Sequence, residues 1–195
     1  SLTGIMDHHL LSGRGDKDVL RQWLTELRKE AISTNKKWAD RLGINASTAI
    51  TAIKPSGTVS QLVDSASGIH PRYSDKYIRR VRADSRDPLC TVLEAAGVPV
   101  EDDIMSPTTR VFSFPIAAPE GAVTASDMGA MEQLDLWEIY QDYWCEHKPS
   151  MTCYYRDEEF LEVGQWLYNK FDKVSGISFL PYSDHTYQQA PYEPI

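Results

Sequence analysis

Apolar side chains recur at helical spacing in several stretches of the chain. Across residues 16–42, 88–96 and 128–145 they lie three or four positions apart, which places them on one face of an α-helix. Another helix is expected after residues 157–159, because this acidic run would stabilise a helix N-terminus. Its apolar side is expected to carry Phe160, Gly164, Leu167 and Phe171.

The helix predicted at residues 128–145 is rich in aromatic residues. We interpret its stripe as a buried packing face and not as a cofactor site. The stripe consists of Met131, Leu134, Trp137, Tyr140 and Trp144.

Short apolar runs between these helices predict strands. The expected strands cover residues 2–6, 45–53, 109–115, 150–155 and 176–181. Strands and helices therefore alternate, with connections long enough for crossovers, which is the pattern of an α/β protein with a largely parallel sheet or barrel. Ligands of such folds bind at the C-terminal ends of strands.

One of these strand ends leads into a turn of small residues. The apolar run up to Ile53 stops at Lys54-Pro55, and the turn Ser56-Gly57-Thr58 leads into a predicted helix at Val59–Val63. Proline ends strand pairing because it lacks an N–H group, and glycine permits a tight turn. The free N–H groups at a helix start favour an anion, so the turn is a candidate phosphate site. The alternative is an ordinary strand-to-helix connection, and the Walker phosphate-binding motif is absent.

Composition narrows the classes of function. The 195 residues are 42% hydrophobic and 25% charged, as in ordinary globular proteins, and the net charge of −8 argues against non-specific binding to nucleic acid or an anionic membrane. No apolar run is long enough to span a bilayer, and no signal-peptide pattern begins the chain. Cys90, Cys145 and Cys153 are scattered and form no C-x-x-C motif, so we interpret them as core residues of a protein in the reducing cytoplasm.

Two further groups of polar residues allow more than one interpretation. The neighbours His8 and His9 would point to opposite faces of a strand, so we predict loop histidines and no metal site. A basic cluster could face an anionic ligand or form a solvated, salt-bridged helix surface. The cluster consists of Lys76, Arg79, Arg80, Arg82 and Arg86.

Several blocks together resemble the catalytic subunit of adenosylcobalamin-dependent (class II) ribonucleotide reductases. They are SLTGIMD (residues 1–7), KPSGTVSQLVDSASGIHPRYSDKYIRRVR (54–82), EHKPSMTCYY (146–155) and SGISFLPYSDHTYQQAPYE (175–193). The resemblance implies that residues 1–195 form a single domain, the C-terminal portion of a ten-stranded α/β barrel. The strand-like start and the extended end also suggest a fragment of a longer protein.

The resemblance assigns a role to the turn. In the family, the matching turn binds the phosphates of the substrate ribonucleotide, a di- or triphosphate, through backbone amides and hydroxyls. The residues implied here are Ser56, Gly57, Thr58, Val59 and Ser60.

The radical chemistry of the family is expected to lie outside this chain. The family uses a cysteine thiyl radical, generated with adenosylcobalamin, and an external thiol reductant such as thioredoxin. No block here matches the thiyl cysteine, so we expect no catalytic residue in this chain and no activity without the remainder of the reductase.

Two alternatives stay open. Tyr154-Tyr155 could correspond to the radical-carrying tyrosine pair of class I reductases, although adjacent tyrosines on a strand usually pack on opposite sides. The chain could also be a catalytically silent nucleotide-binding module that retains only the phosphate turn. A test for reduction with adenosylcobalamin alone would separate the two classes of reductase.

Overall fold

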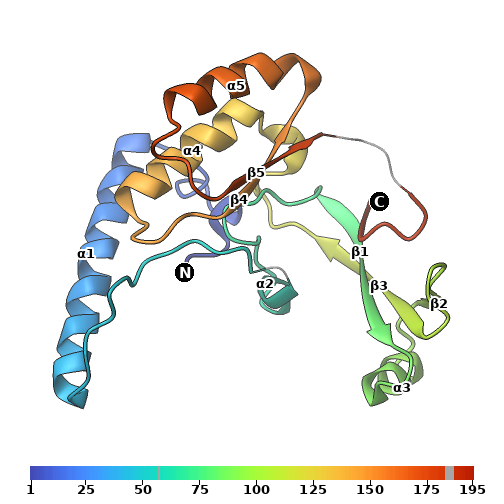
Figure 1. The fold of residues 1–195 in the computed structure, drawn as a ribbon. Helices are drawn as coiled ribbons and strands as arrows, with labels where there is room; N and C mark the ends of the chain where they lie inside the picture. Colours follow the sequence, from blue (N-terminus) through green and yellow to red (C-terminus); the bar gives the residue numbers. More distant parts are fainter. Residues whose placement is uncertain (57, 183–186) are drawn as a thin grey trace. The chain divides into compact units, whose positions relative to one another are not determined.

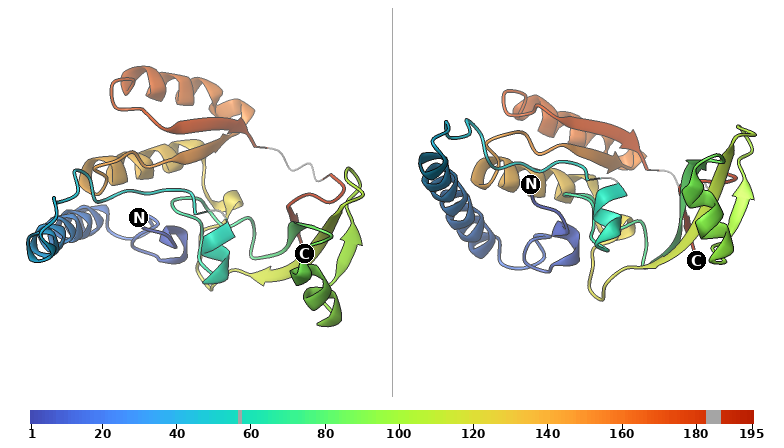
Figure 2. Two further views of the ribbon diagram at one scale, coloured as in Figure 1. Left: turned by 60° about the horizontal axis from the view of Figure 1, so that its bottom comes forward. Right: turned by 90° about the horizontal axis from the view of Figure 1, so that it is seen from below.

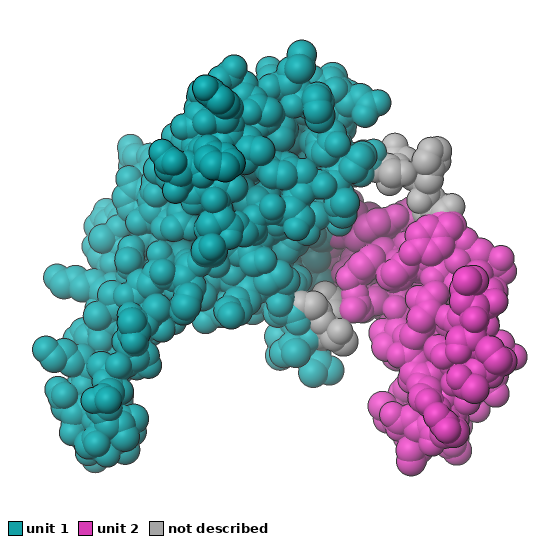
Figure 3. All heavy atoms as spheres, viewed as in Figure 1, with its two compact units in different colours: residues 1–72, 120–182 teal, residues 73–119, 183–195 magenta. Residues whose placement is uncertain are grey.

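The computed structural model describes residues 1–56, 58–182 and 187–195, without the side chains of residues 58 and 61. The chain divides into two compact units (Figure 3). Unit 1 comprises Ser1–Arg72 and Glu120–Tyr182, and unit 2 comprises Tyr73–Pro119 and Ser183–Ile195. The single domain expected for residues 1–195 stays a prediction.

Unit 1 combines helices with a small parallel sheet. Strands β4 (Met151–Tyr155) and β5 (Ile177–Pro181) pair in parallel, as predicted for residues 150–155 and 176–181. The helices of unit 1 are η1 (Ile5–Asp7), α1 (Lys17–Leu42), α2 (Thr58–Leu62), η2 (Ala125–Asp127), α4 (Ala130–Tyr143), η3 (Asp157–Glu159) and α5 (Phe160–Asn169).

Helix α1 begins and ends where its capping residues predict. The Asp16 carboxylate accepts hydrogen bonds from the backbone N–H groups of Asp18 and Val19, which would otherwise lack partners in the first turn. Gly43 follows the helix with φ 66°, a left-handed conformation that favours glycine. The helix predicted at residues 16–42 is therefore confirmed.

The core of unit 1 forms around α4, which contacts α1, α5 and β4 (Figure 1 and Figure 2). The side chains of Trp137 and Tyr140 are fully buried, which confirms the predicted packing face. The indole N–H of Trp137 donates to the carbonyl of Pro149 (2.7 Å), and that of Trp144 donates to the carbonyl of Ala52 (3.0 Å). The aromatic stripe thus fills the core and binds distant backbone with its polar atoms.

Helix α5 buries mainly residues outside the predicted side, of which Leu167 packs partly against the core. Val163 and Trp166 are buried, whereas Phe160 is 60% and Phe171 73% exposed. The ring of Trp166 packs edge to face on Trp137, with 6.0 Å between ring centroids. The interaction of Trp166 with this partner decides which side faces the core, and Phe171 lies beyond the end of the helix.

The predicted strand at residues 45–53 is wrong. Only Ile53 pairs, in an isolated parallel bridge to Pro149. Backbone groups that would pair with a neighbouring strand form hydrogen bonds with a side chain instead. The Glu146 carboxylate accepts from the N–H of Ile50 (2.8 Å) and from that of Thr51 (3.2 Å). The segment is extended but is held by the loop after α4.

The predicted strand at residues 2–6 is also wrong. Gly4 takes φ 69°, which interrupts an extended chain, and Ile5–Asp7 form one turn of 3₁₀-helix. Both Ile5 and Met6 are buried in the core of unit 1. The sequence correctly indicated that these apolar residues are buried, but they are buried on a turn of helix and not on a strand.

Unit 2 is an antiparallel sheet with one helix. Its strand order is β2-β3-β1-β6, and β1 pairs with β3 along its whole length, from Lys76 opposite Ala117 to Asp84 opposite Thr109. The elements of unit 2 are β1 (Lys76–Asp84), α3 (Pro88–Ala95), β2 (Val100–Asp102), β3 (Thr109–Ala117) and β6 (Tyr192–Pro194).

Unit 2 confirms and corrects different predictions. The helix at 88–96 and the strand at 109–115 are confirmed by α3 and β3. The basic cluster lies mainly on β1 and not on a helix. Edge strands β2 and β6, of three residues each, were not predicted, because so few residues show no alternation. The α/β class is confirmed, but among the strands of the described residues the predicted parallel pairing is found between β4 and β5, while the sheet of unit 2 is antiparallel.

The lengths and apolarity of the helices can be compared with those of membrane-spanning helices. Among the described residues, no helix has the length and apolarity that crossing a bilayer requires.

Candidate functional site

The predicted phosphate turn lies at the start of the short helix α2. Gly57 lies outside the described residues, and only the backbone of Thr58 is described. Val59 is 69% exposed, whereas Ser60 is 1% exposed. The N–H of Val59 donates to the carbonyl of Ser56 (2.9 Å), which closes the turn into the helix. The structure therefore presents an open side at Val59 and a buried side at Ser60.

Three hydroxyl groups from separate segments meet at this turn. The Ser56 hydroxyl oxygen lies 3.2 Å from that of Thr3 and 3.3 Å from that of Ser67. The backbone N–H of Ser56 donates to the Ser67 hydroxyl (3.0 Å). We call these three residues the hydroxyl cluster. Hydroxyl groups and helix-start amides are the usual uncharged partners of phosphate oxygens.

The loop that carries Ser67 lies close to the backbone of Lys54, just before the turn. Gly68 takes φ 54°, and a Cβ atom there would lie 2.9 Å from the carbonyl oxygen of Lys54. A larger residue would push the loop away from the turn, because that contact is with backbone. The N–H of Gly68 donates to the Thr3 hydroxyl (3.2 Å), which in turn donates to the carbonyl of Ala66 (2.9 Å).

A buried ionic group lies next to this loop. The guanidinium of Arg72 forms two hydrogen bonds with the Asp7 carboxylate, of 2.8 and 3.0 Å. It also donates to the Asp64 side chain (3.1 Å) and to the Asp64 backbone carbonyl (2.8 Å). The second oxygen of Asp7 accepts from the N–H of Ala66 (2.7 Å). The positive charge of Arg72 is therefore compensated within the protein.

His70 connects the loop to the sheet. Its Nε2 atom accepts from the backbone N–H of Thr152 on β4 (3.0 Å), so its Nδ1 atom is assigned as the donor to the carbonyl of Ser67 (3.1 Å). Burial lowers the pKa of His70, and the hydrogen bond to Ser67 opposes this shift. The neutral ring is thus the form that holds the loop to β4.

The basic cluster of unit 2 is salt-bridged. Arg80 pairs with Glu193, Arg82 with Asp103 (2.6 Å) and Arg86 with Asp84 (2.8 Å). Arg79 lies over the ring of Tyr192, with 5.0 Å from its guanidinium carbon to the ring centroid. The salt-bridged interpretation is confirmed, on a strand and not on a helix.

The three cysteines are free and buried, as predicted. Burial raises the pKa of Cys145 to about 12 and that of Cys153 to about 12, and it also raises the pKa of Cys90. A thiol is reactive as the thiolate, so these environments suit packing.

Tyr154 and Tyr155 lie on β4. Tyr154 is 39% exposed, and Tyr155 packs against Phe160 with 6.0 Å between ring centroids. One tyrosine therefore has a packing role.

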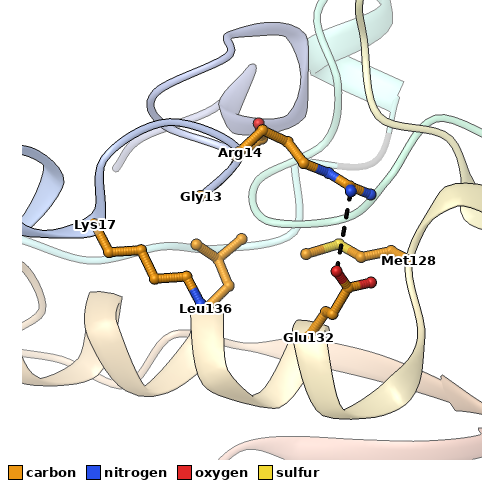
Figure 4. A pocket seen from close by; sticks show the side chains of 7 residues that line it. Gly13, Arg14, Lys17, Met128, Glu132 and Leu136 are labelled. Carbon is orange, nitrogen blue, oxygen red and sulfur yellow. Dashed lines mark ion pairs between the residues drawn. The ribbon is translucent and has the colours of Figure 1, made fainter.

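A small pocket lies elsewhere in unit 1 (Figure 4). Its cavity volume is about 40 Å³, which is room for little more than a water molecule. Arg14 and Glu132 face each other across it, 3.9 Å apart. The other residues that line it are Ser12, Gly13, Lys17, Met128 and Leu136. The pocket contains none of the predicted site residues and is too small for a nucleotide. Within the described ranges, no group of three or more His, Cys, Asp or Glu residues could hold a metal ion.

The fold is that of an α/β protein in which three hydroxyl groups meet at the turn before α2. No protein-family model matches the chain. It is 32% identical over 173 residues to the adenosylcobalamin-dependent ribonucleoside-triphosphate reductase of Levilactobacillus brevis, covering 87% of this chain and 23% of the relative. The reductase of the same name from Lactobacillus leichmannii is 33% identical over 185 residues, with 92% of this chain and 25% of the relative covered.

A solved structure agrees with these relatives. The crystal structure of a B12-dependent (class II) ribonucleotide reductase superposes with a TM-score of 0.80 at 32% identity, covering 92% of this chain and 26% of that chain. The chain spans about a quarter of the length of the curated relatives it matches. It is homologous, over most of its length, to a segment of the adenosylcobalamin-dependent ribonucleotide reductases.

Sequence reasoning missed several residues around the turn. Thr3, Asp7 and Arg72 all lie inside the blocks that carry the family resemblance, but nothing in their spacing connects them to Ser56. The signal available was Arg72 itself: an arginine directly after Gly68-Ile69-His70-Pro71, in a loop with Asp64 close by in sequence. Only the fold brings Asp7 to it.

Proposed function

We propose that this chain is a segment of an adenosylcobalamin-dependent ribonucleotide reductase and supplies the turn that binds the substrate phosphates. The observation that supports the proposal best is the identity to these reductases across most of the chain. The hydroxyl cluster adds a second argument, since Thr3 and Ser67 contact Ser56, the first of the residues that the family resemblance assigns to phosphate.

The chemistry of the turn suits an anion. The Ser56 hydroxyl lies in the hydroxyl cluster at the start of the turn. The family resemblance assigns the backbone amides of residues 57–60 to phosphate, and the N–H of Val59, which donates to the carbonyl of Ser56, would be shared with it. Helix-start amides attract a phosphate without a compensating cation, because their dipoles point toward it. Ser60 is buried, so we assign its contribution to the backbone and to packing below α2.

We further propose that the segment completes a ten-stranded α/β barrel. The parallel pair β4–β5, extended by the bridge from Ile53 to Pro149, would form part of its wall. The turn follows Ile53, so it would lie at the C-terminal end of a barrel strand, where such folds bind ligands. We place the segment in the C-terminal part of the catalytic subunit.

We assign none of the described residues to adenosylcobalamin. The three cysteines are buried, and burial raises the pKa of each thiol, so none of them is proposed as the thiyl cysteine. In the proposed enzyme the cofactor and the thiyl cysteine belong to the remainder of the chain, and these residues bind and orient the nucleotide.

The substrate is proposed to be a ribonucleoside triphosphate, after the names of the relatives, and a thiol reductant such as thioredoxin would regenerate the enzyme. The class I alternative has less support, because the relatives and the solved structure are class II and Tyr155 packs against Phe160.

The experiment measures steady-state kinetics of the full-length reductase with adenosylcobalamin. The Thr58→Leu variant should raise KM for the nucleotide about tenfold or more while kcat changes little, since a hydrogen bond to a charged group contributes about 1.5–3 kcal/mol. Val63→Leu is the control, because Val63 is 71% exposed and lies just beyond α2.

Unchanged affinity in Thr58→Leu would contradict the phosphate assignment. Nucleotide binding without any reduction by the wild-type enzyme would instead support a silent nucleotide-binding module. Reduction that required a metal-containing second subunit would support class I.

A further inference from the structure

The guanidinium of Arg72 occupies an enclosed position next to the phosphate turn. Its side chain is 1% exposed, that of Asp7 is 15% exposed and that of Asp64 is 70% exposed. All these groups belong to unit 1. Burying an ionised guanidinium costs free energy unless hydrogen bonds replace its water, and the two aspartates supply four of them.

The hydrogen bonds of Arg72 reach both ends of the turn. At the far end it holds the backbone carbonyl of Asp64, two residues after the last residue of α2. At the near end the connection is indirect. Arg72 orients the Asp7 carboxylate, which accepts from the N–H of Ala66. The next residue, Ser67, accepts from the N–H of Ser56 through its hydroxyl. One side chain thus connects the beginning and the end of the segment that contains the phosphate contacts.

The backbone of Arg72 is itself fixed. Its N–H donates to the carbonyl of Val123 (2.9 Å), and its carbonyl accepts from the N–H of Ala125 (2.8 Å), on either side of its bridge to Thr124. The backbone that carries the guanidinium is therefore held by hydrogen bonds on both sides. Asp64 takes φ 49°, an unusual conformation for a non-glycine residue, and the bonds from Arg72 to its carbonyl and carboxylate hold it there.

We propose that Arg72 is a positioning residue, which holds Ser56 at the start of the proposed phosphate turn and Asp64 just beyond α2, through Asp7 and Asp64, without touching the nucleotide. The inference rests on the proposed function. The two carboxylates outweigh the single positive charge, so Arg72 does not act as a general attractor of phosphate. Its effect comes from the planar fork of the guanidinium, which binds a carboxylate through two parallel hydrogen bonds.

This role predicts a specific kinetic signature. Arg72→Lys keeps the charge but loses the fork, so in the full-length reductase with adenosylcobalamin we expect KM for the nucleotide to rise about tenfold, with kcat within about a factor of two. Arg72→Met loses the fork and also leaves the Asp7 carboxylate without its partner, so KM should rise at least as much as in Arg72→Lys. Arg14→Lys is the matched control and should leave KM unchanged, because Arg14 borders the separate pocket of Figure 4.

Coupling to the turn separates positioning from general stability. Because Arg72 acts through the turn, Arg72→Lys should raise KM by a much smaller factor in the Thr58→Leu background than in the wild type. Equal factors in both backgrounds would overturn the proposal, and so would equal losses of kcat and of kcat/KM in Arg72→Lys alone.

Further outcomes separate the two proposals. If Thr58→Leu raises KM but Arg72→Lys does not, the positioning role is wrong and the phosphate turn stands. If neither changes KM, the phosphate turn itself is wrong. Should Arg72→Lys not fold, Asp64→Ala replaces it, since that carboxylate is mostly exposed, its removal takes away a side-chain acceptor of Arg72, and the buried pair with Asp7 is kept. We expect a rise in KM of about two- to threefold there, and an unchanged KM overturns the proposal.

Discussion

In unit 1 the aromatic side chains of α4 fill an apolar core, whereas in unit 2 arginine–carboxylate pairs connect neighbouring strands. Trp137 and Tyr140 are fully buried, and the hydroxyl of Tyr140 donates to the carbonyl of Leu11 (2.8 Å). In unit 2, Arg80 on β1 pairs with Glu193 on the neighbouring β6, and Arg110 on β3 pairs with Asp102 on the neighbouring β2.

The difference shows how each unit resists unfolding. Removal of apolar surface from water stabilises unit 1 and does not depend on charge pairs that salt screens. Unit 2 also buries apolar side chains, among them Tyr77, Val111 and Phe112, and adds ion pairs that contribute little individually where they are exposed and are screened by salt. The candidate site lies in unit 1, where a buried ion pair is surrounded by hydrogen-bonded backbone.

The largest effect is expected from Trp137→Ala. It removes a fully buried ring and its hydrogen bond to Pro149, so the free energy of unfolding should fall by about 3–5 kcal/mol. Urea denaturation followed by circular dichroism measures the loss. Trp23→Ala is the control, since Trp23 is 46% exposed, and should change stability by about 0.5 kcal/mol or less. Equal losses in both variants would contradict the assignment of the core to α4.

A smaller effect is expected in unit 2 from Asp103→Ala. The variant loses the partner of Arg82 and the acceptor for the N–H groups of Met105 and Ser106. Its melting temperature should fall less than that of Trp137→Ala and more than that of Arg86→Ala, whose side chain is 83% exposed. Differential scanning calorimetry tests the order, and a larger loss in Arg86→Ala would refute it.

The smallest expected effect is a difference between the two units in hydrogen-exchange protection in mild acid. Burial lowers the pKa of His70 in the folded protein, so a locally unfolded state binds a proton at a higher pH than the folded state does. The contribution of His70 to stability is therefore complete above pH 6.5 and is lost as the pH falls below that value. The hydrogen-exchange protection of the Thr152 amide should therefore decrease below pH 6.5. The Tyr154 amide is the control, because it donates to the uncharged amide of Gln133.

The carboxylate of unit 2 should respond at lower pH. The hydrogen bond from Arg82 holds the pKa of Asp103 below its ordinary value of 3.8, so its contribution is kept above that pH and is lost only as the pH falls further. Protection of the Met105 amide should therefore persist between pH 6.5 and about 4. Loss of protection at Thr152 and Met105 over the same range would remove the distinction between the units.

The sequence by itself determined the elements whose signals are local. Helical periodicity and caps located α1, α3 and α4, and alternation located β3, because each depends on residues within a few positions of one another. Lys54-Pro55-Ser56-Gly57 likewise marked the end of an extended segment and the start of α2. The family resemblance then gave this turn its proposed role in phosphate binding.

Tertiary structure decided what depends on partners distant in sequence. Residues 45–53 form no strand because Glu146 and Trp144 bind their backbone, and α5 turns Val163 and Trp166 inward because Trp137 is there to receive Trp166. The surroundings of the turn also come from the fold: the Asp7 carboxylate and Arg72 are 65 residues apart and meet at 2.8 Å. A hydrogen bond depends on distance and angle in space, and neither is encoded by the spacing of two residues along the chain.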